Sequence, residues 1–494
     1  MLRGFVIIGV SVSVLGVSSC KRVGEQVKEM LTELRTEQSI GELDELLNAM
    51  DTALDAPAKP VSEKYARVDI APVRTAMWQL LKTKKYGELN KKLDELLEQR
   101  TYSYDGNLVY LDIMQMLAKS PEMPDWVEST VSIHTKAMAV QKFIDLAWRA
   151  RGNGYASSVS DQGWRDFGKH LEDGNKALVV ALKEDPENPA ALYAGVTIGI
   201  GQGWEKKAFR SYLEAAKGAE FKESEITGKI IYYLTSRWHG SVSEMSDFIK
   251  DDLIEWPDGA GKYQAMLSAL SYEMPRGKRK AILSEASTQE VLNKIVEEYA
   301  TAWPQGGEVI GRVAELYLDE NMYAECLALC DKYDDRVEKS AALSLARGRV
   351  LWKLNRRAES IAELERGAAL HPTSGHIYYQ AAWVHTQSLN YAKAEPYSRH
   401  ALEFLGRNDN FYRERCLRYI AVSSLNQKKW DEVLELSKKA LALNQDIAMS
   451  WYLYGEGLYN TGKKEDAKKV WERSVSLDPN NRRYLDSHYP GWDK

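Results

Sequence analysis

Apolar residues along this chain recur at intervals of three and four, which is the period of an amphipathic α-helix. Near the N-terminus the pattern is carried by Leu43, Leu46, Leu47, Met50 and Leu54. Further along, it predicts helices over residues 108–117, 131–151, 164–183 and 189–200. No segment keeps the strict alternation of a half-buried strand, and the most β-prone patch, residues 196–198, lies inside a helical run. We therefore expect an all-α fold.

The C-terminal part of the chain repeats with a fixed period. Equivalent positions in successive predicted helix pairs are Ile310, Ser344, Tyr378, Leu417 and Trp451, which are spaced by 34, 34, 39 and 34 residues. The longer interval contains a loop insertion at residues 406–410. Because one helix pair cannot bury its apolar side alone, this period favours about five pairs stacked into a superhelical solenoid.

The last repeat resembles the tetratricopeptide repeat (TPR) family, whose repeat length is 34 residues. The resemblance rests on Trp451, Gly455, Leu458, Ala467, Trp471 and Pro479. It implies that the first helices of the pairs form a concave groove for a peptide or a partner helix. The groove residues it implies are Arg349, Trp352, His376, Tyr379, Trp383, Arg415, Arg418, Tyr452, Glu456 and Tyr459. Aromatic and arginine side chains suit a protein-binding surface; the alternative is an exposed face without a ligand.

The first twenty residues have the pattern of a bacterial signal peptide. Arg3 is followed by an apolar run over residues 5–17, and Ser18 and Ser19 precede Cys20. Residues 17–20 resemble the lipobox of bacterial lipoproteins, which implies cleavage before Cys20 and acylation of that cysteine, for example by palmitate. Two acyl chains suffice for stable membrane anchoring. The alternative is an ordinary secretory signal with a chance cysteine.

The lipoprotein interpretation places the protein in the bacterial cell envelope, held to a membrane by its N-terminal lipid. Lys21 stands where an aspartate often signals retention in the inner membrane, so the periplasmic face of the outer membrane is favoured. Residues 21–60 are then a helical spacer or linker that ends in the Ala/Pro-rich residues 56–60. This segment either lifts the body off the membrane or forms a helical hairpin packed on the body.

Two tryptophan-containing blocks mark the middle of the chain, one at residues 147–156 and one at residues 237–241. They resemble the two landmarks of the DUF4034 family, a bacterial domain without an assigned activity. The resemblance implies a helical domain, here residues 61–300, followed by the TPR-like domain at residues 301–494. Its motif residues are Trp148, Arg151, Gly152, Gly154, Arg237, Trp238, Gly240 and Ser241. Turn-forming glycines and core tryptophans explain the blocks structurally; a cation–π stack or an anion-binding corner is the functional alternative.

The residues carry no recognisable catalytic or metal-binding motif. The eight histidines are scattered, at His134, His170, His239, His371, His376, His385, His400 and His488, and none has zinc-ligand spacing. Cys326, Cys330 and Cys416 form no disulfide framework and are interpreted as buried thiols. With a net charge of −5, nucleic acid is not an expected partner. We expect no cofactor, no metal and no enzyme activity.

These patterns together predict a membrane-tethered scaffold that binds a protein or peptide of the envelope through its TPR-like groove. One alternative is that the DUF4034-like domain is a small-ligand receptor or an enzyme, which the repeats only recruit. Arg151, Arg237, Trp238 and His239 would then line its pocket. A second alternative, a regulator of envelope or cell-wall assembly, rests on analogy with other TPR lipoproteins.

Overall fold

The computed structural model describes residues 41–55, 66–152, 156–218, 224–236, 238–253, 260–275, 277–406 and 409–493. Within these residues the regular secondary structure is helical except for two short parallel strands, β1 (Arg67–Val68) and β2 (Tyr102–Ser103). The expected all-α fold is confirmed. The predicted signal peptide, Cys20, the linker at residues 56–60, Gly154 and Arg237 lie outside the described residues.

Helix pairs make up most of the chain. The N-terminal pairs are α6 (Ile133–Arg151) with α7 (Asp161–Glu184), α8 (Pro189–Gln202) with α9 (Lys206–Gly218), and α10 (Ser224–Leu234) with α11 (Val242–Asp247). Next come α12 (Gly261–Glu273), α13 (Arg279–Leu283) and α14 (Ala286–Ala302). The C-terminal pairs are α15 (Glu308–Asp319) with α16 (Tyr323–Lys332), α18 (Ala341–Lys353) with α19 (Arg357–Leu370), α20 (Gly375–Gln387) with α21 (Tyr391–Phe404), α22 (Asn410–Asn426) with α23 (Trp430–Leu443), and α24 (Ala448–Asn460) with α25 (Lys464–Leu477). Short α17 (Asp334–Val337) follows α16, and α26 (Asn480–His488) closes the array.

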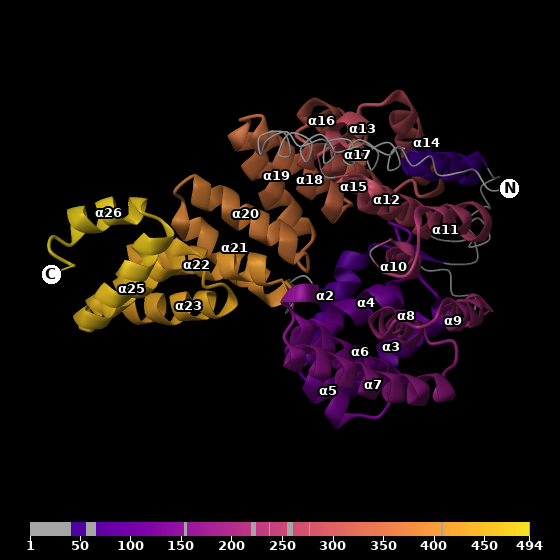
Figure 1. The fold of residues 1–494 in the computed structure, drawn as a ribbon, viewed down its shortest axis with the longest axis horizontal. Coiled ribbons are helices and arrows are strands. Elements are labelled where there is room, and N and C mark those ends of the chain that lie inside the picture. The colour runs from indigo at the N-terminus through magenta and orange to yellow at the C-terminus, as the bar shows by residue number, and fades with distance from the viewer. Residues whose placement is uncertain are drawn as a thin grey trace, which may run out of the picture.

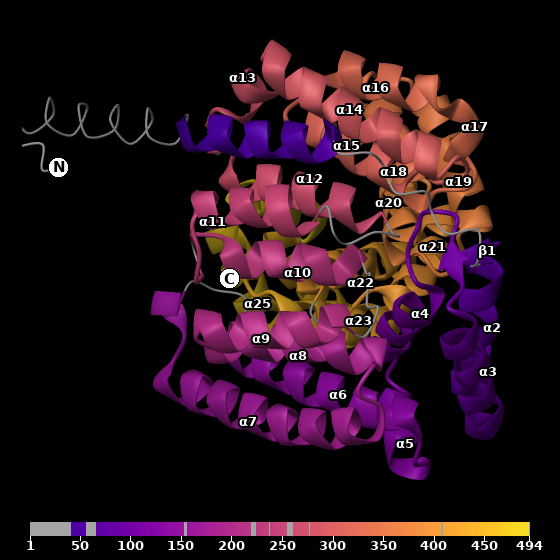
Figure 2. The ribbon, with the colours of Figure 1, turned by 90° about the vertical axis from the view of Figure 1, so that its right-hand side faces the viewer.

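The first helices of these pairs form one continuous stack, α6, α8, α10, α12, α15, α18, α20, α22 and α24, in which each helix packs against the next. Figure 2 shows α6, α8, α10 and α12 lying one above another in this stack. The superhelix therefore begins well before the repeats that the 34-residue period reveals. We call the surface formed by these helices the first-helix face.

One backbone turn recurs between the two helices of each C-terminal pair. Its marker is a residue with positive φ two positions before the second helix: Asn321, Asn355, Leu389, Lys428 and Gly462. These residues are spaced by 34, 34, 39 and 34 positions, the spacing of the sequence repeat. Lys84 occupies the same place between α2 (Ile70–Lys82) and α3 (Tyr86–Gln99). The repeat is thus a structural unit in which a residue with left-handed backbone conformation, at the same position each time, reverses the chain between the two helices.

Helices α2, α3, α4 (Val109–Ala118) and α5 (Met123–Ser129) are not members of this stack but pack against it and connect distant parts of it. Figure 1 places α2 and α4 between the N-terminal pairs and the C-terminal pairs. At one end, Asn188, which caps α8, donates to the Tyr110 hydroxyl of α4 at 3.3 Å. At the other end, the Trp78 indole of α2 packs against the Phe404 ring of α21 at a tilt of 39°, with ring centroids 4.7 Å apart. Helices α2–α5 therefore join the N-terminal helix pairs to the C-terminal helix pairs, which we call the two arms of the superhelix.

Residues 41–55 form a helix that packs on the body of the protein. Its apolar side chains, including Leu46 and Met50, are fully buried in the main hydrophobic cluster. On its polar side, Asp51 pairs with Lys294 of α14 at 2.5 Å. Of the two alternatives for residues 21–60, packing on the body therefore holds for residues 41–55.

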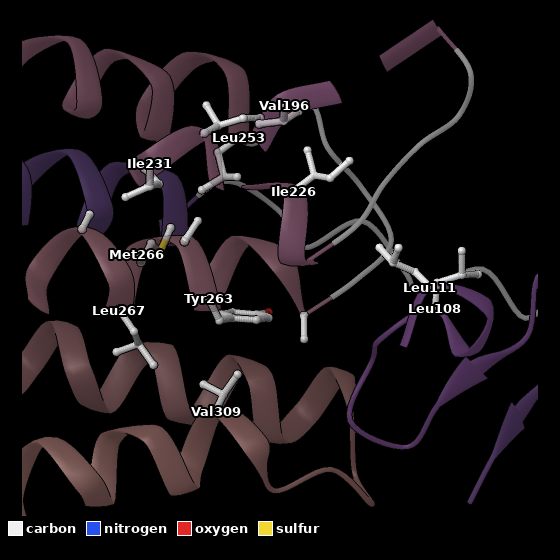
Figure 3. Packing of buried hydrophobic residues seen from close by; sticks show 14 of the residues in the cluster. Leu108, Leu111, Val196, Ile226, Ile231, Leu253, Tyr263, Met266, Leu267 and Val309 are labelled. Carbon is white, nitrogen blue, oxygen red and sulfur yellow. The ribbon is translucent and has the colours of Figure 1, made fainter. Parts of the chain in front are cut away.

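The largest hydrophobic core runs through the N-terminal pairs and α15. Figure 3 shows apolar side chains from successive first helices meeting there, among them Val196, Ile226, Met266 and Val309. Leu108 and Leu111, which precede and begin α4, lie close to the same cluster. Burial of so much apolar area in one cluster is the main force that holds α4 against the stack.

Candidate protein-binding face

The predicted groove residues of α18 and α20 form a half-buried aromatic cluster on the first-helix face. The rings of Trp352 and Trp383 meet edge to face, with centroids 5.1 Å apart. Arg349 lies one turn before Trp352 and is paired with Glu315 at 3.1 Å and with Asp319 at 3.2 Å, both on α15. The structure places these three residues on neighbouring helices, and the charge of Arg349 is balanced by carboxylates of α15.

A second cluster connects α20 to α22. The buried Tyr379 hydroxyl accepts a hydrogen bond from Arg415 at 3.1 Å, and its ring meets Tyr412 with centroids 4.9 Å apart. The exposed His376 also meets Tyr412, at 4.8 Å. The Arg415 guanidinium lies 4.2 Å from the ring centroid of Phe411, a side chain that is 57% exposed. Aromatic rings and an arginine with large accessible area are what protein-binding surfaces use as anchors.

Phe411 and Tyr412 are functional candidates that the repeat pattern does not indicate. They stand in the first turn of α22, directly after the insertion that lengthens the interval from 34 to 39 residues. In the register of the repeat, these positions precede the first helix of the other pairs, so the TPR pattern gives no signal for them. The run of two aromatic residues next to a loop was the only available sign.

Six exposed or half-buried residues of the two clusters define one surface, which we call the α18–α22 patch. Residues His376, Tyr379 and Trp383 of α20 follow each other at helical spacing on one side of that helix, so they join both clusters. The patch consists of Arg349, Trp352, His376, Trp383, Phe411 and Arg415.

Arg418 of the predicted groove forms an ion pair within the protein. It pairs with Glu414 at 3.0 Å, a carboxylate that is only 4% exposed. Glu414 also accepts a hydrogen bond from Ser450 of α24 at 2.7 Å. Arg418 therefore neutralises a buried carboxylate that connects α22 to α24, a role in which removal of one partner is costly.

The last three predicted groove residues, Tyr452, Glu456 and Tyr459, face the C-terminal segment of the chain. Glu456 is buried and accepts hydrogen bonds from the hydroxyls of Tyr452 and Tyr489, the latter at 2.5 Å. Burial raises the pKa of the Glu456 carboxyl, against the effect of these two donors. Tyr459 meets the Tyr489 ring at 4.7 Å. These three residues contact the C-terminal segment of the chain, and they are therefore not part of the surface formed by the other groove residues.

The two DUF4034-like blocks meet in the structure. The indole rings of Trp148 and Trp238 pack edge to face with centroids 6.1 Å apart. Gly240 passes so close to α10 that an added Cβ would lie 2.2 Å from the Leu234 carbonyl oxygen, and Gly152 has a φ of +72°. Ser241 caps α11 by accepting from the Glu244 amide. Each of these glycines and the serine has a local structural reason for its identity.

The side chains of Arg151 and His239, which also belong to these blocks, lie against different helices. The Arg151 guanidinium lies 5.6 Å from the Trp148 ring centroid and 5.5 Å from that of Trp164, between α6 and α7. His239 instead lies against α8, with its Nε2 atom 3.4 Å from the Ile200 carbonyl oxygen. Arg151 and His239 therefore contact different helices, α7 and α8 respectively.

Thiol and metal chemistry receive no support from the described parts of the chain. Cys326, Cys330 and Cys416 are fully buried, and burial raises the pKa of the Cys416 thiol to about 12, so it stays protonated at neutral pH. Among the residues that the structure describes, no group of histidine, cysteine and carboxylate side chains is placed to hold a metal ion. Within the same residues, no helix combines the length and apolarity needed to cross a membrane.

Comparison with known proteins agrees with the helical-repeat architecture. Residues 448–481, which hold α24 and α25, match the tetratricopeptide repeat family. A comparison with curated proteins gives no match. Among solved structures, the chain is similar to YrrB, described as a TPR protein with an unusual peptide-binding site, at 18% identity over 40% of this chain and 96% of that chain, with a TM-score of 0.34.

Two further solved structures are similar to this chain. One is MamA from MSR-1, at 18% identity over 35% of this chain and 97% of that chain, with a TM-score of 0.30. The other is the APC/C hetero-tetramer Cut9–Hcn1, at 13% identity over 84% of this chain and 82% of that chain, with a TM-score of 0.34. The fold and the family match define a TPR-like helical solenoid, a class of protein that presents surfaces to peptide or protein partners.

Proposed function

We propose that this protein is a lipid-anchored scaffold of the bacterial envelope that binds a protein partner at the α18–α22 patch. The observation that carries the proposal is the contact of Arg415 with the exposed Phe411 ring, next to the paired indoles of Trp352 and Trp383. Large rigid rings lose little conformational entropy on binding, and an arginine beside them adds directional hydrogen bonds.

The tether is supported by the sequence around Cys20 and by the placement of the helices. In Figure 1 the helix of residues 41–55 and α26 lie toward opposite ends of the longest axis. A chain anchored through Cys20 would present its C-terminal repeats at a distance from the attachment point. The lipid then serves to hold the partner near the membrane, with the outer membrane favoured by Lys21.

Site-specific photo-crosslinking tests the binding surface. A photoreactive phenylalanine analogue at position 411 is expected to give a discrete adduct in intact cells, and Arg415→Glu should abolish it. The same analogue at position 164 is the matched control, because Trp164 is also exposed (40%) but belongs to α7, a second helix. Equal adducts at both positions would contradict the assignment of the patch.

Mass spectrometry tests the tether separately. The N-terminal peptide of the protein purified from membranes is expected to begin at Cys20 and to carry the mass of its acyl chains. Cys20→Ser should move the protein to the soluble fraction while adducts at position 411 persist. An unmodified Cys20 would remove the anchor from the proposal and leave the patch standing.

A further inference from the structure

A cavity of about 430 Å³ lies between α9, α10, α11 and the π-helix η2 (Phe248–Asp252), which continues α11. Helix α9 borders it from Lys206 to Glu214, and α11 with η2 borders it from Glu244 to Asp251, in each case at intervals of three and four residues. One face of each helix therefore points to the cavity. Helices α9 and α11 are second helices of neighbouring pairs, and the cavity shares no residue with the α18–α22 patch. We call it the α9–α11 cavity.

The buried part of the lining is apolar. Phe209 and Tyr233 are each 2% exposed, and their rings stack with centroids 3.7 Å apart. Ile230 and Phe248 extend this apolar surface. The Tyr233 hydroxyl donates to the Trp204 carbonyl oxygen at 2.8 Å, so its hydrogen is already used within the protein. A ligand that enters the cavity therefore buries apolar surface against these rings.

Both cations among the described lining residues lie near a single carboxylate. Lys206 donates a hydrogen bond to Glu244 at 2.6 Å. This hydrogen bond lowers the pKa of the Glu244 carboxyl, and the positive charge of Arg210 acts in the same direction. The protein's own side chains therefore neutralise the cavity around Glu244.

The other three lining carboxylates, Glu214, Asp247 and Asp251, form no ion pair with these two cations. Lys250, which does not border the cavity, lies 3.5 Å from Asp247 and 4.0 Å from Asp251. All three of those side chains are largely exposed, and such ion pairs contribute little free energy. The side chain of Glu214 makes no ion pair or hydrogen bond with any residue that the structure describes. Negative charge without a close counterion therefore remains in the cavity.

This negative charge lies away from the neutralised end. The Lys206–Glu244 ion pair joins the first lining residue of α9 to the first lining residue of α11. Glu214 follows Lys206 by eight residues, and Asp251 follows Glu244 by seven. At a rise of 1.5 Å per residue, both carboxylates stand about 10–12 Å further along their helices. Apolar lining such as the Phe248 ring lies between the two ends.

An organic cation suits this arrangement better than a metal ion does. Among the residues that the structure describes, no group of three histidine, cysteine or carboxylate side chains is placed to hold a metal ion. Two carboxylates beside apolar surface suit an ammonium group on an apolar body, because the hydrogen bonds between them are charge-assisted. Phe248 and Asp251 also belong to a π-helical turn, and such turns occur frequently at functional sites.

We propose that the α9–α11 cavity binds an organic cation that carries a primary ammonium group on an aromatic or other apolar body. The body packs on Phe209, Tyr233 and Phe248, and the ammonium group donates hydrogen bonds to Glu214 and Asp251. The inference does not rest on the proposed function, since it concerns other helices and another kind of ligand.

The test uses dansylcadaverine, a primary ammonium joined by a five-carbon chain to an aromatic dansyl group, and the full-length protein. Its emission is expected to rise and shift to shorter wavelength on binding, because the dansyl ring leaves water. N-acetyl-dansylcadaverine, which lacks the charge, should bind at least tenfold more weakly. The double variant Glu214→Gln/Asp251→Asn should weaken binding of dansylcadaverine by a similar factor, and both side chains are exposed, so the fold should be retained.

Two control variants should leave the affinity unchanged. Glu172→Gln removes an exposed carboxylate of α7, and Phe411→Ser with Arg415→Glu alters only the α18–α22 patch. Absence of binding to the native protein would overturn the proposal, as would equal binding of the acetylated probe or equal binding by the double variant. If Ca²⁺ displaces the probe at micromolar concentration and the double variant no longer binds Ca²⁺, the cavity is a metal site and the proposal is wrong.

Discussion

The indole nitrogen of Trp78 donates a hydrogen bond to Glu403 Oε1 at 3.0 Å, across 325 residues of sequence. Trp78 belongs to α2 and is only 1% exposed, while Glu403 stands near the end of α21. Lys82, one turn further along α2, pairs with the same carboxylate at 3.4 Å. This contact connects the N-terminal helices to the C-terminal repeats, and so it helps to fix how the two arms of the superhelix lie.

Replacing Trp78 should loosen the C-terminal arm. Trp78→Phe removes the indole donor and leaves space in a buried site, which is expected to cost about 2 kcal/mol of folding free energy. Hydrogen–deuterium exchange should then increase in α20 and α21 more than in α6 and α7. The control is Glu403→Gln, which retains an oxygen acceptor and should have a smaller effect. Faster exchange spread evenly over the protein would contradict a local connection.

Leu389 offers a stabilising substitution. It has a φ of +57° and is 73% exposed, in the turn position that Asn321 and Asn355 occupy in the preceding repeats. A left-handed backbone costs leucine about 1–2 kcal/mol and costs asparagine less. We expect Leu389→Asn to raise the free energy of unfolding by about 0.5–1 kcal/mol, measured by urea unfolding. Leu354→Asn is the matched control, since Leu354 is exposed but has a φ of −82°, and an equal gain there would refute the backbone explanation.

The sequence allowed the C-terminal repeats to be predicted because their period comes from local structure. A residue with left-handed backbone conformation stands at the same position between the two helices of each pair, from Asn321 to Gly462. The spacing of the repeat therefore appears directly in the sequence. The N-terminal pairs lack such a signal. Helix α8 could be predicted as a helix, but it is buried almost continuously from Ala190 to Ile200, so its sequence does not mark one side as the packing face.

The candidate sites were only partly predictable for a related reason. Trp352, Trp383 and Arg415 follow from the repeat register, but Tyr452 and Glu456 are covered by Tyr489, a contact that no periodicity encodes. The two tryptophan blocks meet because the ring of Trp238 packs beside that of Trp148, ninety residues earlier in the chain. Long-range packing decides both cases.

The three described thiols should be protected in the native protein. Cys326, Cys330 and Cys416 are fully buried, and the raised pKa values of Cys330 and Cys416 keep their thiols protonated. Iodoacetamide at pH 8 is expected to label none of the three until urea unfolds the protein, as read by peptide mass spectrometry. Rapid labelling of Cys326 and Cys330 in native conditions would show that α16 opens readily.

Asp105 makes stability depend on pH near neutrality. Its Oδ1 atom accepts hydrogen bonds from the amides of Gly307 at 2.8 Å and Glu308 at 3.0 Å, at the start of α15. Burial, together with the nearby Glu308 carboxylate, raises the pKa of Asp105 to about 6. Because this pKa is higher in the folded state than in the unfolded chain, the protonated form favours folding. That contribution is fully present below about pH 4 and is lost as the pH rises through 6.

Asp105→Asn should remove this dependence and leave the cap intact. The asparagine Oδ1 atom can accept the same two amides, and it carries no charge to bury. We expect the variant to gain on the order of 2 kcal/mol over the native protein between pH 4 and pH 8, measured by urea unfolding across that range. Groups that the two proteins share titrate in both, so the difference isolates Asp105. Asp125→Asn, at an exposed carboxylate of α5, is the control, and parallel curves for native protein and Asp105→Asn would show that Asp105 is already ionised without penalty.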